Sequence, residues 1–349
     1  MAADATPSSL SRLRAPSLVT VLGLAFVLLI ALWLAVNLIK TPSDFFEVTA
    51  IGITNGSVYA LVALGYTLVY GILELINFAN GDVFMLGGMF TITYANHFFG
   101  LHQGQGAIIV LWVAFTLVLV MLTCGGLNTM IEFFAYRPLR NAPRLAPLIT
   151  AIGVSFIIEN VALAVWGPEY VIAPDILPRS DVFHIGGFDY QWNKFIAVII
   201  TVPVLLLLMY LVQSTRQGKA MRATAQDRDA SAMMGINVNR TISFTFLIAG
   251  ALAGAAGVVY ALYFTSVKFD QGFQLGLIAF TAAVLGGIGN LPGAVLGAVL
   301  IGLLQGWNEG LNWHAPGSDW TQSMVFAILI LILVFRPSGL LGEQTPEGG

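Results

Sequence analysis

Charged residues are scarce in this sequence. Only 9% of its 349 residues are Asp, Glu, Lys or Arg, whereas 57% are apolar. Soluble domains carry roughly 25% charged residues, which a chain of this size needs to cover its surface. Uncharged runs of about 20 residues recur instead, each long enough to cross a hydrocarbon core ~30 Å thick. The composition therefore excludes a soluble globular protein and predicts an integral membrane protein that crosses the bilayer many times.

Cysteine and the common catalytic motifs are missing as well. Cys124 is the single cysteine, which excludes an internal disulfide framework and a CxxC-type metal site. The four histidines are dispersed, and the chain contains no HExxH, no GxSxG and no phosphate-binding GxxxxGK[ST] sequence. We therefore expect no catalytic residue, no metal site, no cofactor and no nucleic-acid partner. Any ATP that drives this protein must be hydrolysed by another one.

Ten apolar runs are candidate membrane spans. They cover residues 17–39, 48–73, 83–99, 107–131, 147–166, 195–213, 241–264, 273–288, 291–311 and 322–335. The runs 83–99 and 273–288 are short enough to be re-entrant or broken helices. We expect an all-α polytopic membrane protein of about 8–10 transmembrane helices, some of them short or broken. The transmembrane domain would occupy residues 17–336, between a polar segment at 1–16 and a tail at 337–349.

Basic residues predict the orientation. They form four groups: Arg12 and Arg14; Arg137, Arg140 and Arg144; Arg216, Lys219, Arg222, Arg228 and Arg240; and Arg336. If ten spans cross, all four groups lie on one side, which the positive-inside rule assigns to the cytoplasm. The loop from Gly167 to Lys194 has more acidic than basic residues and belongs outside. Both termini are therefore predicted to be cytoplasmic.

Glycine and alanine recur at helical spacing in two of the runs. They form "AGALAGAAG" at 249–257 and "GAVLGAVLIG" at 293–302. Small residues on one helix face let two helices approach closely in lipid, where packing rather than hydrophobicity drives association. The pattern predicts tight helix contacts without indicating a function.

The longest polar insertion after the sixth run, "STRQGKAMRATAQDRDASAMMGINVNR" (Ser214 to Arg240), predicts a short helix. Small and apolar residues recur among charged ones, and Gly235 to Asn237 supplies a stop signal. Such a helix can insert its apolar side into a groove of a partner protein. It can equally rest on lipid headgroups, which would attract its basic residues.

A polar segment, "INFANGD" (Ile76 to Asp82), separates two apolar runs. In hydrocarbon, an unpaired Asn costs several kcal/mol and an ionised Asp costs about 3 kcal/mol. One interpretation is a polar turn at the cytoplasmic interface, with Asn77 or Asn80 capping the next helix and Asp82 in its first turn. The other is a helix break short of the interface, so that residues 76–82 line the translocation route or an inner gate.

Two further polar sites lie in or between the predicted spans. "GGIGNLP" (286–292) separates two runs in a similar way, and its Gly289 and Asn290 could form a second gate element. Glu159 lies within the run 147–166. An intramembrane carboxylate indicates a pathway or a subunit interface, although the outer interface is close enough to offer Glu159 polar surroundings instead.

Four segments of the sequence resemble the LivH-type permeases of bacterial branched-chain amino acid ABC importers. They are "NGSVYALVALGYTLVYGILELINFANGDVFMLGGM" (55–89), "RPLRNAPRLAPLITAIGVSFIIEN" (137–160), "GKAMRATAQDRDASAMMGIN" (218–237) and "AFTAAVLGGIGNLPGAVLGAVLIGLLQ" (279–305). Within the third, "DASAMMG" resembles the Glu-Ala-Ala-x-x-x-Gly signature by which such permeases dock on their ATPase. Asp229 replaces the Glu of that signature and Ser231 replaces its second Ala.

The resemblance implies an inner-membrane permease that translocates branched-chain or related amino acids. Its partners would be membrane lipid, a homologous LivM-like permease subunit, two ATPase subunits and a periplasmic substrate-binding protein. The residues that it implies for ATPase coupling are Gly218, Arg222, Asp227, Asp229, Ala230, Gly235 and Asn237. Two alternatives remain: a urea or short-amide ABC permease, and a secondary transporter that works without ATP. The scarcity of intramembrane charge for ion coupling argues against the second alternative.

Overall fold

The computed structural model describes residues 18–99, 107–140, 142–143, 145–174, 181–185, 188–336 and 338–342. The polar segment 1–16 lies outside these residues, as do Arg144 and most of the tail.

The described chain is almost entirely helical. Its helices are α1 (Leu18–Lys40), α2 (Pro42–Leu73), α3 (Ala79–Tyr94), α4 (Ala107–Ile131), α5 (Leu145–Trp166), α6 (Trp192–Ser214), α7 (Arg216–Gln226), α8 (Arg228–Met233), α9 (Val238–Phe264), α10 (Gln271–Gly286), α11 (Leu291–Gly310) and α12 (Ser318–Phe335). A π-helical turn (Ala95–Phe99) extends α3, and a π turn (Glu132–Tyr136) and a 3-10 turn (Arg137–Leu139) extend α4. Strand β1 (Val171–Ile172) pairs antiparallel with β4 (Ser266–Val267), and β2 (Asp181–Ile185) pairs antiparallel with β3 (Phe188–Gln191).

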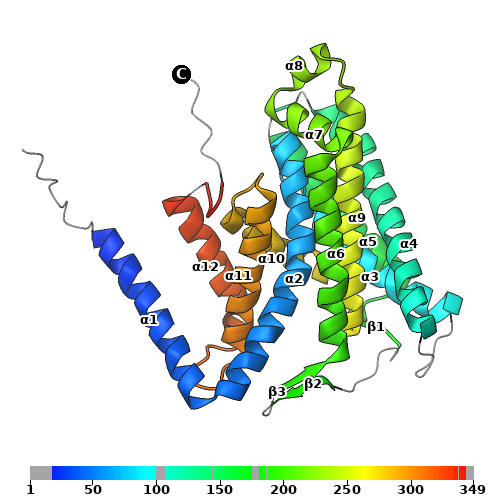
Figure 1. Ribbon diagram of the computed structural model, residues 1–349. Helices are drawn as coiled ribbons and strands as arrows, with labels where there is room; N and C mark the ends of the chain where they lie inside the picture. The colour runs from blue at the N-terminus through cyan, green and yellow to red at the C-terminus, as the bar shows by residue number, and fades with distance from the viewer. Residues whose placement is uncertain are drawn as a thin grey trace, which may run out of the picture.

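These elements confirm an all-α polytopic membrane protein. Each of the ten predicted runs overlaps one of the helices over most of its length. Seven of the described helices are long and apolar enough to cross a membrane: α2, α4, α5, α6, α9, α11 and α12. The two runs predicted to be short became α3 and α10, which have only 16 residues each. The bundle carries α7 and α8 at one end and the strands at the other (Figure 1). We refer to these as the α7–α8 end and the strand end.

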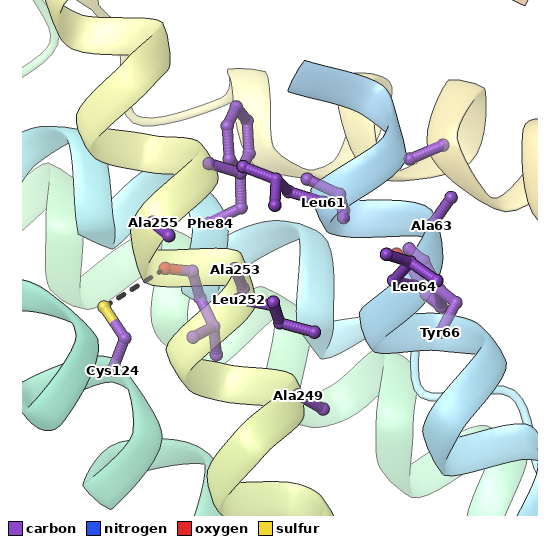
Figure 2. Packing of buried hydrophobic residues seen from close by; sticks show 14 of the residues in the cluster. Leu61, Ala63, Leu64, Tyr66, Phe84, Cys124, Ala249, Leu252, Ala253 and Ala255 are labelled. Atoms are coloured by element: carbon purple, nitrogen blue, oxygen red, sulfur yellow. Dashed lines mark hydrogen bonds between the residues drawn. The ribbon is translucent and has the colours of Figure 1, made fainter. Parts of the chain in front are cut away.

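Helices α2 and α9 form the core of the bundle. In their membrane-spanning windows, 83% of α2 and 78% of α9 are buried. Side chains of α2 around Leu61 and Leu64 pack beside those of α9 around Leu252 (Figure 2). On the other side of α9, Cys124 of α4 places its Sγ 3.7 Å from the Val83 carbonyl oxygen of α3.

Small residues make these contacts close, as their spacing predicted. A Cβ at Gly254 of α9 would lie 2.9 Å from the Cβ of Cys124, and one at Gly302 of α11 would lie 2.5 Å from the Gly52 carbonyl oxygen of α2. Real Cβ atoms do not approach other atoms so closely, so larger side chains at either glycine would separate the helices.

Candidate functional site

The segment 214–240 folds as two short helices where one was expected. Helix α7 ends at Gln226 because Asp227 turns the chain and caps α8, its Oδ1 accepting a 2.9 Å hydrogen bond from the Ala230 N–H. The predicted stop is confirmed: α8 ends at Met233, and Gly235 adopts a left-handed φ of 85°. Asn237 then caps α9 through the Arg240 N–H at 3.0 Å.

The two faces of this segment differ. Met221 and Thr224 of α7 are buried against the bundle. Met233 and Met234, at the end of α8, are 81% and 84% exposed, next to the exposed Asp229. An apolar tip that points away from the bundle is available to another protein or to a membrane surface.

Two arginines attach the segment to the ends of spanning helices. The Arg222 guanidinium donates to the Val212 carbonyl near the end of α6. Arg228 donates to the Ile72 carbonyl near the end of α2 at 2.8 Å. The last carbonyls of a helix have no intrahelical partner and lie at its negative end, so a cation satisfies both their hydrogen bonding and their charge. Gly218 permits the close approach, because a Cβ there would lie 2.6 Å from the Val212 carbonyl carbon.

The polar segment 76–82 lies inside the bundle. Helix α2 ends at Leu73, Glu74 adopts a left-handed φ of 55°, and α3 begins at Ala79. The Asn80 side chain lies beside Gly65, where a Cβ would be 2.9 Å from its Nδ2. Because Gly65 precedes the end of α2 by eight residues, Asn80 lies about 12 Å in from that end at the usual helical rise. Residues 74–78 therefore run back into the bundle before α3 starts.

The expectation that Asn77 or Asn80 caps α3 is wrong. Phe78 occupies the N-cap position, and no side chain caps the helix. Asn77 instead makes tertiary contacts: its Oδ1 accepts a 2.7 Å hydrogen bond from the Tyr136 hydroxyl, and its Nδ2 donates to Asn128 at 3.4 Å. Asp82 does lie in the first turn of α3, as expected.

The start of α10 meets the start of α3. A Cβ at Gly81 would lie 2.8 Å from the Gly276 Cα, and one at Gly272 would lie 2.5 Å from Asp82 Oδ1. The two helices then diverge: Gly88 of α3 lies beside Val267 at the strand end, and Gly289, just beyond α10, lies beside Gly71 near the end of α2. Two positive helix N-termini thus converge on one carboxylate within the bundle.

This crossing of α3 and α10 holds polar groups without partners. Asn80 and Asp82 are fully buried, and none of their four side-chain oxygen and nitrogen atoms forms a hydrogen bond of regular geometry with a described residue. Ser155 of α5 lies beside Asp82, and the half-buried Glu159 lies close enough for its charge to act on it. Such groups are costly to bury, so their presence indicates a function rather than a contribution to stability.

The second predicted break is a capped turn. Asn290 caps α11 by accepting a 3.0 Å hydrogen bond from the Gly293 N–H, and its Nδ2 donates to the Leu341 carbonyl at 2.8 Å. Gly289 has a left-handed φ of 96°. The turn nevertheless lies close to the first break, because Ile76 and Ile288 line the same narrow apolar gap.

A buried ion pair next to these elements was missed from the sequence. Glu132, fully buried beyond the end of α4, accepts hydrogen bonds from the Arg140 guanidinium and, at 2.6 Å, from the Ser243 hydroxyl. Burial lowers the pKa of Arg140; the negative charge of Glu132 opposes this shift, and the positive charges of Arg137 and Arg228 add to it. An acidic residue at the end of an apolar run, followed by two arginines, was the signal available in the sequence.

A cavity of about 300 Å³, partly open to solvent, lies between the segment 214–240 and the end of α2. Its walls include Ile72, Glu74, Arg140, Asp227 and Arg228. The cavity is therefore bounded by Arg228, which binds the end of α2, and by Glu74, where the connector from α2 to α3 (residues 74–78) begins.

Comparisons with known proteins agree over most of the chain. Residues 48–334 match the family described as branched-chain amino acid transport system / permease component. The chain is 36% identical over 299 residues to the high-affinity branched-chain amino acid transport system permease protein BraD of Pseudomonas aeruginosa, covering 85% of this chain and 95% of that protein. It is 38% identical over 301 residues to LivH of Escherichia coli K12, with the same coverage.

Two further matches are more distant. A probable branched-chain amino acid transport permease protein LivH of Methanocaldococcus jannaschii is 24% identical over 83% of this chain and 90% of that protein. The solved structure of PsaBC from Streptococcus pneumoniae in complex with Fab aligns with 88% of this chain and 97% of that one. Its TM-score of 0.41 and identity of 15% are too low to add to the argument.

Proposed function

This chain belongs to the family of branched-chain amino acid transport permease components, and we propose that it is the membrane-spanning permease subunit of an ABC importer for branched-chain or related amino acids. The family match over residues 48–334 carries this proposal. The named relatives transport branched-chain amino acids, which favours that substrate class over urea and short amides.

A permease of this family works with ATPase subunits and a substrate-binding protein. The second permease subunit is a homologue of the LivM type, and the helices with largely exposed apolar faces offer it a surface. Only 22% of the spanning window of α5 and 11% of that of α12 are buried. Apolar helix faces of this extent are covered by lipid or by another membrane subunit.

The α7–α8 end faces the cytoplasm and docks on the ATPase. The exposed tip at Asp229, Met233 and Met234 enters the ATPase, while the caps at Asp227 and Asn237 fix the position of α8 relative to α9. Gly235 allows the chain to leave α8 in a left-handed turn that other residues seldom adopt.

The crossing of α3 and α10 is the closed gate of the pathway. Its support is the set of unpartnered polar groups at Asn80 and Asp82, with Glu159 leading toward the strand end. Asn77 anchors the connector on one side of the gate. The capped turn at Gly289 and Asn290 holds the far end of α10 on the other.

The assembly is tested by purifying the tagged chain from its native membranes and identifying the proteins that accompany it. We expect an ATPase and a second permease, and we expect the chain alone to hydrolyse no ATP. The binding protein of the same system should respond to leucine and not to urea. Recovery of the chain by itself, in a form that transports without ATP, would instead assign it to the secondary transporters.

Docking is tested at Gly235. We expect Gly235→Glu to abolish uptake while the protein still inserts into the membrane, because the new side chain strains the turn and adds charge at the docking tip. Gly235→Asn is the matched control, since asparagine tolerates left-handed φ and adds no charge; it should retain most uptake. Full uptake by Gly235→Glu would contradict the docking role.

A further inference from the structure

Arg228 connects two parts of the chain that are distant in sequence. It is the first residue of α8, and its Nη2 donates to the Ile72 carbonyl across a separation of 156 residues. Its side chain is half-buried, whereas the neighbouring cations Lys219 and Arg240 are exposed. A hydrogen bond from a charged donor to the end of a helix is among the stronger non-covalent links available at this position.

Arg222, the other arginine that binds a helix end, adds no connection between distant parts of the chain. Arg222 binds the end of α6, but α6 already continues into α7 through a single residue. Its hydrogen bond therefore duplicates a covalent connection. Arg228, in contrast, links the docking helix α8 to a helix that does not adjoin it in the sequence.

Helix α2 leads directly to the gate. Immediately after Ile72 and Leu73 the chain turns at Glu74 and runs back into the bundle to α3, which starts at the crossing with α10. The connector is held at its other end by Asn77, which the Tyr136 hydroxyl binds at 2.7 Å. A displacement of the end of α2 must therefore bend the connector or move the start of α3.

The surroundings leave room for such a displacement. Side chains that border a solvent-open pocket can shift without disturbing a close-packed interior. The cavity of about 300 Å³ lies where α8 faces the end of α2, and Arg228 and Ile72 both line it.

We propose that Arg228 is a positioning residue that transmits movement of the docked α8 to the α3–α10 gate by holding the Ile72 carbonyl of α2. This inference rests on the proposed function, in which α8 docks on an ATPase. It adds a residue that docking alone does not require, because Arg228 faces the bundle and not the exposed tip.

The test uses the complete complex of permease, ATPase and binding protein in proteoliposomes, with uptake and ATP hydrolysis measured together. For Arg228→Gln we expect normal assembly and ATP hydrolysis, while uptake per ATP falls about tenfold, the factor that corresponds to losing one charged hydrogen bond. Arg228→Lys should recover part of this ratio, because an ammonium group can donate to the same carbonyl. Lys219→Gln and Arg240→Gln are the matched controls and should leave the ratio unchanged.

Two results would overturn the inference. One is an unchanged ratio of uptake to hydrolysis in Arg228→Gln. The other is a parallel loss of ATPase binding and hydrolysis, which would make Arg228 part of the docking contact only. A wild-type chain that recruits no ATPase would overturn the proposed function itself, and the wild-type preparation reveals this before any variant is made.

Discussion

At the scale of single residues, Asp82 is a carboxylate buried deep in the bundle. An ionised carboxylate at the centre of a membrane costs about 3 kcal/mol on insertion scales. Each of the two helix N-termini that converge on it contributes up to ~2 kcal/mol in favourable buried geometry. The cost and these contributions are therefore of similar size. Ser155 of α5 lies beside the carboxylate, whose two oxygens form no hydrogen bond of regular geometry with a described residue.

We expect Asp82→Asn to raise the thermal stability of the purified protein slightly while reducing uptake at least tenfold, because the carboxylate is kept for transport at a cost in stability. Thermal unfolding in detergent and uptake into vesicles measure the two effects. Thr201→Val on α6 is the control: it removes a buried hydroxyl that also lacks a partner, and it should leave uptake intact. A loss of stability in Asp82→Asn would show that the carboxylate is structural.

Glu132, unlike Asp82, is a buried carboxylate that accepts hydrogen bonds from Arg140 and Ser243. We expect Glu132→Gln to lower the free energy of unfolding by on the order of 3 kcal/mol, because Arg140, only 12% exposed, is left without its counter-ion. The double variant Glu132→Gln/Arg140→Gln should regain part of this loss in thermal unfolding. Equal destabilisation by the single and double variants would mean that the pair does not act as a unit.

At the scale of elements, the contact between α3 and α10 depends on glycine. We expect Gly272→Ala to cost about 1–3 kcal/mol and to abolish uptake, because the added methyl group overlaps Asp82 and separates the helices. Gly126→Ala in α4 and Gly153→Ala in α5 are matched controls, since a Cβ at either position meets no atom within 4 Å. They should be neutral or stabilising in the same thermal assay, because alanine favours helix more than glycine does. Equal losses of stability and uptake in all three alanine variants would show that the contact between α3 and α10 does not depend on Gly272 in particular.

The positions of the helices along the chain were predictable from the sequence. How deep in the bundle α3 and α10 start was not. Hydrophobic runs located every long helix, and run length identified α3 and α10 as short. Helices α3 and α10 start at the same place because Gly81 contacts Gly272. These residues are far apart in the sequence, so no local sequence pattern predicts their contact. The capping expectation for Asn77 failed for a related reason: Tyr136, from a distant segment, competes for its oxygen. The division into α7 and α8 was missed although Asp227, a strong N-cap residue, was present as a signal.

At the scale of the whole molecule, docking of α8 on an ATPase and the role of Arg228 both depend on which end of the bundle faces the cytoplasm. The α7–α8 end carries Arg216, Lys219, Arg222, Arg228 and Arg240, whereas the loop that includes Glu169 lies at the strand end. The positive-inside rule then predicts that α7 and α8 lie in the cytoplasm.

The single native cysteine makes a measurement of this orientation direct. Cys124 is fully buried in the packing of α4 against α9 and should not react with a membrane-impermeant maleimide. We expect Glu169→Cys, at an exposed position near the strand end, to be labelled in intact cells. Lys219→Cys, at an exposed position of α7 outside the docking tip, should be labelled only after the membrane is permeabilised. The reverse labelling pattern would put the docking tip outside the cell, away from ATP. It would exclude both the ATPase contact and the role of Arg228, because a cytoplasmic ATPase could not then act on the end of α2.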